Sequence, residues 1–277
     1  MTLKTGIAPG WAIAKVTALE VISEPLALLM GITAQLLATL APAFHYHQFG
    51  EPTRMARDAG ISAIIIGGTL IAVFGAIKTF RRDIELGTAA VCLSHGIGRR
   101  TIFLAKTAGV AMAYGMFFAT TAAVSLTVTN GAAIGGYAAA QSGALARLWG
   151  PSLAIAISPV LIALIGGALL NRFLRCRFVR SANLLALAAA AAGTAYRFDG
   201  ALYLGHLADL ALAGLPALAY LAAASAFAAK FRMNAAGALA ALTVAVQLPF
   251  LRGWAVAPAV LLFLYLGEVF FDECDIA

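Results

Sequence analysis

The sequence predicts an all-α fold, a polytopic helical membrane bundle with six to eight transmembrane helices, on two observations. Of its 277 residues, 62% are apolar and only 11% are charged, whereas an ordinary soluble domain has roughly 25% charged residues. The mean hydropathy is +0.92, and a helix needs about 20 apolar residues to cross about 30 Å of hydrocarbon. A water-soluble globule is therefore excluded. Because no linker or charge block divides the chain, 1–277 is expected to form one transmembrane domain.

The basic residues predict the orientation. Cytoplasmic loops of membrane proteins are enriched in Lys and Arg. With the N-terminus inside, fourteen of the 19 basic residues fall on the cytoplasmic side, and five fall outside: Arg54, Arg57, Arg147, Arg197 and Arg252. Both termini are thus expected in the cytoplasm. The protein is expected in the inner or plasma membrane. The net charge of +7 is explained by this asymmetry and indicates no nucleic-acid partner.

The first expected element is an interfacial N-terminal helix over about residues 9–24. Trp11, Ala14, Ala18, Val21 and Ile22 fall on one side of a helix, and Thr17, Glu20, Ser23 and Glu24 fall on the other. Such a helix can lie in the membrane interface, and Pro25 then lets the chain turn into the bilayer. A longer, tilted first span is the alternative.

Eight apolar stretches follow as expected spans. They are 25–44, 61–80, 102–129, 151–170, 181–196, 207–229, 235–251 and 254–271. The last four are short and rich in alanine, and 181–196 is barely long enough to cross without tilt. A bundle of six spans is therefore the alternative to one of eight.

The connection between the second and third stretches, residues 81–100, is called the coupling segment below. Asp83 is expected to cap a short helix and Glu85 to lie in its first turn, where a carboxylate suits the positive helix end. Ser94-His95-Gly96 is expected to end this helix. Apolar residues recur at spacings of three and four and predict an apolar ridge: Leu86, Ala89, Ala90 and Leu93.

At these residues the chain resembles the permease subunits of the type 2 family of ATP-binding-cassette (ABC-2) exporters. Members carry a glutamate, a Gly-Thr pair, apolar residues and a serine, then a basic residue and a lysine that opens the next span. The matching positions here are Glu85, Gly87-Thr88, Leu93-Ser94, Arg99 and Lys106. The family usually has a proline after the serine, where this chain has His95-Gly96. The second half of the chain resembles the family only in hydropathy.

The resemblance implies a coupling helix that docks on a separate cytoplasmic ATPase. It assigns the contact to Asp83, Glu85, Leu86, Gly87, Thr88, Leu93, Ser94 and Arg99. It also implies a paired permease, such as a homodimer, and ATP with Mg²⁺ held by the partner. The chain itself has no GxxxxGK[ST] motif, so no nucleotide site and no catalytic residue is expected in it. The alternatives are a helix with no partner, a membrane scaffold that recruits a cytoplasmic protein, and an ion-coupled carrier.

Other polar residues give weaker indications. His45 and His47 form an HxH pair that could hold zinc or copper, although two surface histidines without a metal are expected more often. Gln35, Asp209 and Gln247 are the possible residues of a translocation path, because polar groups inside spans are costly. The alternatives are an interfacial position for Asp209 and hydrogen bonds between packed helices for the two glutamines. His206 is expected to be an isolated loop residue.

Overall fold

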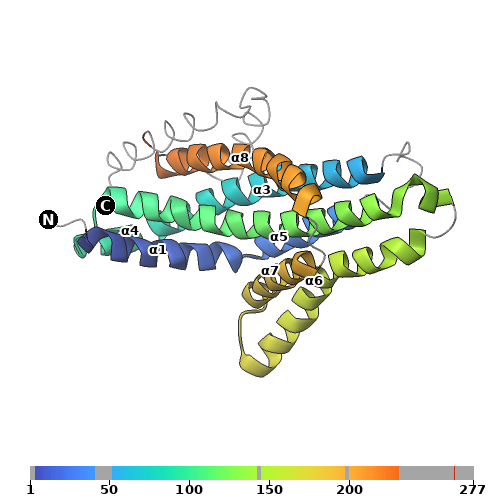
Figure 1. Cartoon of the computed structure of the whole chain (residues 1–277). Coiled ribbons are helices and arrows are strands. Elements are labelled where there is room, and N and C mark those ends of the chain that lie inside the picture. Colours follow the sequence, from blue (N-terminus) through green and yellow to red (C-terminus); the bar gives the residue numbers. More distant parts are fainter. Residues whose placement is uncertain (1–3, 41–51, 142–144, 197–199, 231–264, 266–277) are drawn as a thin grey trace. The chain divides into compact units, whose positions relative to one another are not determined.

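The computed structural model describes residues 4–40, 52–141, 145–196, 200–230 and Tyr265, and regular structure within these ranges is helical throughout. The expected all-α fold is confirmed for this part of the chain. The expected stretch 235–251 lies outside the described residues, as does 254–271 apart from Tyr265. The helices, shown in Figure 1, are α1 (Lys4–Ile22), α2 (Pro25–Leu40), α3 (Pro52–Glu85), α4 (Thr88–Ser94), α5 (Arg99–Gln141), α6 (Leu145–Leu174), α7 (Phe178–Tyr196) and α8 (Gly200–Lys230).

Five of the described helices are long and apolar enough to cross a membrane. Their candidate spans are Thr53–Asp83, Arg99–Ala133, Ala154–Leu174, Phe178–Ala195 and Leu204–Ala226. A sixth possibility is the pair Pro9–Ile22 and Pro25–Leu40, which meets the same criteria together and is bent by 64° at the break between its helices. The chain is therefore a multi-span membrane protein. The total number of spans in the whole chain, eight or six, stays a prediction.

The burial of side chains on α1 differs from the two faces expected for the N-terminal helix. Ala14, Ala18 and Val21 are buried as expected, but Thr17 is buried with them at 2% exposure. Trp11 is 60% exposed and does not share that face. Thr17 is buried because α5 comes close to α1 at this point, where Gly109 leaves room for its side chain.

Contacts within the chain divide it into two compact units. Unit 1 comprises Met1–Val21, Thr69–Tyr114 and Leu215–Ala277, and unit 2 comprises Ile22–Gly68 and Gly115–Gly214. The divisions fall inside α1, α3, α5 and α8 rather than in the loops. Each unit is therefore a packing cluster of helix segments.

Unit 1 is built on close approach of α1, α3 and α5. A Cβ atom added at Gly109 of α5 would lie 2.6 Å from the Ala14 carbonyl oxygen and 2.6 Å from Thr17 Cβ on α1. One at Gly75 of α3 would lie 3.0 Å from a methyl group of Val110. Small residues let helices pack this closely in membranes, where dispersion contacts hold helices together.

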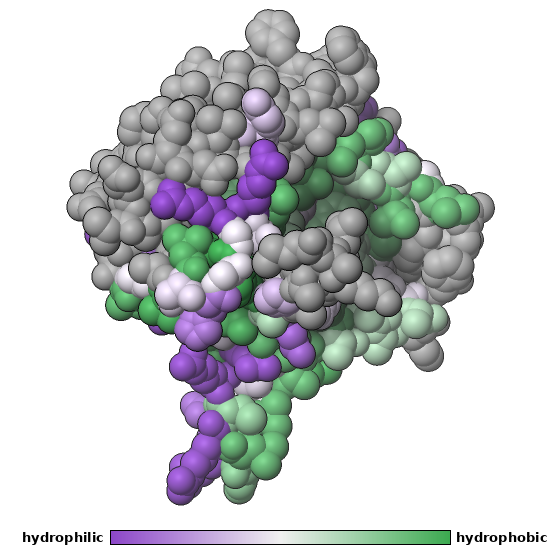
Figure 2. All heavy atoms as spheres, turned by 90° about the vertical axis from the view of Figure 1, so that its left-hand side faces the viewer, coloured by the Kyte–Doolittle hydropathy of each residue, from purple (hydrophilic) through white to green (hydrophobic). Residues whose placement is uncertain are grey.

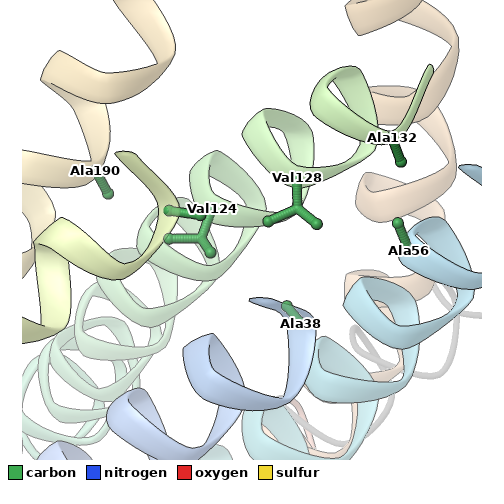
Figure 3. Packing of buried hydrophobic residues seen from close by; sticks show 7 residues of the cluster. Ala38, Ala56, Val124, Val128, Ala132 and Ala190 are labelled. Atoms are coloured by element: carbon green, nitrogen blue, oxygen red, sulfur yellow. The ribbon is translucent and has the colours of Figure 1, made fainter. Parts of the chain in front are cut away.

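Unit 2 packs mainly through alanine and valine. One cluster joins α2, α3, α5, α6 and α7 and comprises Ala38, Ala56, Val124, Val128, Ala132, Ala156 and Ala190. Figure 3 shows the labelled side chains of this cluster pointing toward one another. Helices α6 and α7 pack as an antiparallel hairpin, in which Gly167 leaves room for Ala182 and Phe178. The Asn183 amide also donates to the Ile22 carbonyl oxygen at 2.8 Å.

Two glycines of α5 provide a matched test of this packing. Gly109→Ala should lower the stability by about 1 to 3 kcal/mol, because the new methyl group meets backbone that cannot move aside cheaply. Gly115→Ala should be neutral or stabilise by up to about 1 kcal/mol, because open space surrounds that position. Thermal unfolding in detergent measures both. Equal stabilities of the two variants would contradict the close α1–α5 contact.

Candidate functional site

The coupling segment forms two tight turns around a short helix. Helix α3 ends at Glu85, α4 runs from Thr88 to Ser94, and α5 begins at Arg99. Gly87 has a φ of 65° and Gly96 has a φ of 75°. These are left-handed conformations that glycine adopts without steric cost, so each glycine reverses the chain where a helix has ended.

The structure corrects the expected start of the short helix. Asp83 and Glu85 belong to the last turn of α3, and Gly87 is the residue that precedes α4. The prediction that Glu85 lies in the first turn of the short helix is therefore wrong. The physical reason is Gly87, whose left-handed conformation ends α3 and begins α4 after both acidic residues. The side chain of Glu85 lies outside the described part of the chain.

Asp83 connects three elements of unit 1. Thr88 Oγ1 at the start of α4 donates to Asp83 Oδ1 at 2.7 Å. The Lys106 ammonium of α5 forms an ion pair with Asp83 Oδ2, and the two side chains are only 10% and 16% exposed. An ammonium removed from water is costly unless a carboxylate pairs with it. The pair therefore fixes the end of α3 against α5, and the hydrogen bond fixes α4 to both.

A second ion pair supports the same corner with less burial. Arg82 on α3 lies 3.7 Å from a carboxylate oxygen of Glu20 on α1, and the side chains are 52% and 41% exposed. Water screens a pair of this kind, and its contribution is about 0 to 1 kcal/mol. The Asp83–Lys106 pair is thus the stronger constraint.

The far end of α4 is closed by the side chains of Ser94 and His95. Ser94 Oγ donates to the Val91 carbonyl oxygen at 2.7 Å. His95 Nδ1 lies 2.9 Å from the same oxygen. Carbonyl groups at the end of a helix lack partners within it, and these two side chains supply them. Ser94-His95-Gly96 therefore ends the helix, as expected from the sequence.

Apolar side chains of the coupling segment are exposed between basic residues. Leu86 is 62% exposed and Val91 is 58% exposed, whereas Leu93 is half-buried. The side chains of Ala89 and Ala90 are not described. Arg81, Arg82 and Arg100 are exposed on either side of α4, and Arg99 is half-buried. Figure 2 views this end and shows hydrophobic and hydrophilic residues side by side. The segment thus offers a mixed surface typical of protein contacts.

A second group of polar residues lies within unit 2 and was largely missed by the sequence analysis. We call Arg57, Ser125, Thr129, His206 and Asp209 the polar cluster. His206 Nε2 on α8 lies 3.0 Å from Ser125 Oγ and 3.4 Å from Thr129 Oγ1 on α5. One turn along α8, Asp209 lies 3.4 Å from the Arg57 guanidinium of α3.

The polar cluster corrects the expectation for His206. This histidine is 5% exposed inside α8 and not an isolated loop residue. A Cβ at Gly60 of α3 would overlap the Ser125 side chain, so the glycine lets α3 approach this part of α5. The sequence signal was available, because Ser125 and Thr129 are spaced by four residues, but only the fold brings His206 to them.

The other residues expected in a site are not part of the polar cluster. Gln35 is buried on α2, and its Oε1 atom has no hydrogen-bond partner among the described residues. His45, His47 and Gln247 lie outside the described residues. Where the structure describes the chain, it brings no three His, Cys, Asp or Glu side chains together as metal ligands. Comparisons with family models, with curated proteins and with solved structures find no match to this chain.

Asp83→Asn tests the buried ion pair. It leaves the Lys106 ammonium buried beside an uncharged amide, and breaking a buried pair typically costs about 3 to 5 kcal/mol. Glu20→Gln is the matched control, since it breaks a half-exposed pair in the same unit and should cost at most about 1 kcal/mol. Thermal unfolding in detergent compares the two. Equal losses would show that Lys106 does not depend on Asp83.

Ser125→Ala tests the polar cluster. It removes the nearest partner of His206 Nε2, and a buried polar group left unpaired costs about 1 to 3 kcal/mol. Ser158→Ala serves as the control, because Ser158 Oγ donates to the Ile155 carbonyl oxygen of its own helix. Denaturant unfolding in mixed micelles should separate the two variants by at least about 1 kcal/mol. A Ser125→Ala protein as stable as wild type would argue against the hydrogen bond.

Proposed function

We propose that this chain is the membrane permease subunit of an ATP-driven exporter, and that its coupling segment docks on a separate cytoplasmic ATPase. The observation that carries the proposal is the seven-residue helix α4, held between two candidate spans by Asp83, with Leu86 and Val91 exposed. At a connection that faces water, exposed large apolar side chains suit a protein-docking surface.

The geometry suggests how force from a partner would reach the membrane. Asp83 holds α4 to α3 through its own helix and to α5 through Lys106. A push on α4 would therefore be transmitted to both long helices together, and not absorbed by a flexible loop. In the proposed mechanism, ATP binding closes the partner ATPases, and the partner contacts two states of the permease differently, which supplies the work.

The proposal includes the parts that the ABC-2 resemblance implies. Two permease copies act with two ATPase subunits, ATP and Mg²⁺ bind to the partner, and the coupling segment and both termini face the cytoplasm. The basic residues at 81, 82, 99 and 100 support this orientation, because cytoplasmic connections are enriched in Arg and Lys. Transport of a substrate between the copies is the function proposed for the pair.

An ion-coupled carrier is the second candidate, and the polar cluster favours it. His206, Asp209 and Arg57 all belong to helices that qualify as candidate spans. Ionisable groups inside spans commonly belong to substrate or ion pathways. In the exporter, the same cluster would lie along the translocation path, where Asp209 was expected from the sequence.

The decisive experiment asks whether a cytoplasmic ATPase depends on the exposed residues of the coupling segment. The purified chain alone should not hydrolyse ATP, and the chain extracted gently from its native membrane should carry ATPase activity. In the double variant Leu86→Asp/Val91→Asp, the ATPase activity that stays with the chain should fall at least about tenfold. Burying each apolar side chain contributes about 1.5 to 3 kcal/mol, and a buried carboxylate opposes docking.

Leu174→Asp is the matched control, because Leu174 is 67% exposed at the end of α6 and outside the coupling segment. It should retain the ATPase activity. A double variant that also retains the activity would contradict the docking surface. Transport driven by an ion gradient without any ATPase would support the carrier, and a retained partner without ATPase activity would support the scaffold.

A further inference from the structure

The turn between α6 and α7 carries a cluster of four cations. Arg172, Arg175, Arg177 and Arg180 all lie within nine residues and are exposed. The sequence has no acidic residue between Glu85 and Asp199, so the hairpin cannot neutralise them itself. Among the residues that the structure describes, none of the four forms an ion pair.

The cluster lies at the end of an exposed apolar stripe on α6. Leu161, Ile165, Leu169 and Phe173 recur every four residues and are 51%, 60%, 51% and 74% exposed. They belong to the candidate span Ala154–Leu174, of which only 28% is buried within the protein. At 1.5 Å per residue the stripe extends for about 18 Å. A stripe of this kind faces hydrocarbon, so the arginines that follow it lie at the depth of lipid headgroups.

The backbone of the turn holds the cations in place. Phe178, at the start of α7, packs against Gly167 and the cluster of Ala163, Ala182 and Ala186. Arg175 has a φ of 54°, a conformation that glycine would adopt at no steric cost. Figure 2 shows hydrophilic residues beside hydrophobic ones at the tip of this hairpin. The turn thus presents guanidinium groups next to apolar side chains on a packed base.

We propose that the α6–α7 turn is a binding site for anionic phospholipid headgroups. Guanidinium groups bind phosphate oxygens in a bidentate manner, and the adjacent Phe173 and Leu174 suit the acyl chains below a headgroup. Clusters of four or more cations next to a span attract anionic lipid. A second copy of the chain is a poor occupant, since its net charge is also positive. This inference does not depend on the proposed transport function.

The test measures lipid binding by the purified full-length protein in detergent micelles. Fluorescent phosphatidylglycerol is the anionic probe, and fluorescent phosphatidylcholine, which has no net charge, is the reference. Wild type should prefer phosphatidylglycerol. Each arginine near an anionic surface contributes about fivefold in affinity, so Arg172→Gln/Arg177→Gln should reduce the preference about 25-fold. Arg172→Lys/Arg177→Lys, which keeps both charges, should retain most of it.

Two further variants separate a site from general charge and from a structural role. Arg54→Gln removes one exposed arginine at the start of α3 and should leave the preference unchanged. Arg175→Gly should lower the preference about fivefold while the melting temperature stays the same or rises, because glycine relaxes the positive φ. An unchanged preference in the Arg172/Arg177 glutamine variant overturns the proposal, as does a loss of about fivefold in the Arg54→Gln control. Loss of a bound ATPase with lipid preference intact would instead assign the turn to a protein partner.

Discussion

The ammonium group of Lys106 is the constraint on which the arrangement of the coupling segment depends. It lies on a long apolar helix with little access to water, and such a charge needs a carboxylate at contact distance. Asp83 provides it. Because Asp83 also accepts a hydrogen bond from Thr88, the carboxylate that pairs with Lys106 of α5 also holds the start of α4 to the end of α3. Docking and force transmission, if they occur at α4, depend on this one carboxylate.

The second constraint is the need for glycine where two helices come into close contact. Gly109 and Gly75 in unit 1 and Gly60 and Gly167 in unit 2 each stand where a Cβ atom would meet a neighbouring helix. Close approach matters more in a bilayer than in water, because lipid tails offer no hydrophobic drive for helices to associate. Polar groups such as His206 can then be buried, since the neighbouring helix brings Ser125 within hydrogen-bond distance.

The helices of the described part were largely predictable, and the contacts between them were not. Hydropathy alone located α2, α3 and α5 to α8, because about 20 consecutive apolar residues have few other uses. The error over Glu85 arose because Asp83 resembles a helix N-cap in sequence, whereas the left-handed Gly87 decides the boundary. Thr17 and His206 were misassigned for a related reason. Their burial depends on α5, which lies far from both in the sequence.

The proposed docking of α4 on an ATPase can be tested by site-specific photocrosslinking. A photoreactive amino acid at Val91, exposed on α4, would be activated in native membranes, and the crosslinked product identified by mass spectrometry. We expect a protein with a nucleotide-binding P-loop as the main product, and a shift in its yield when ATP is trapped. Crosslinks to lipid alone, or to a protein without a nucleotide site, would contradict it.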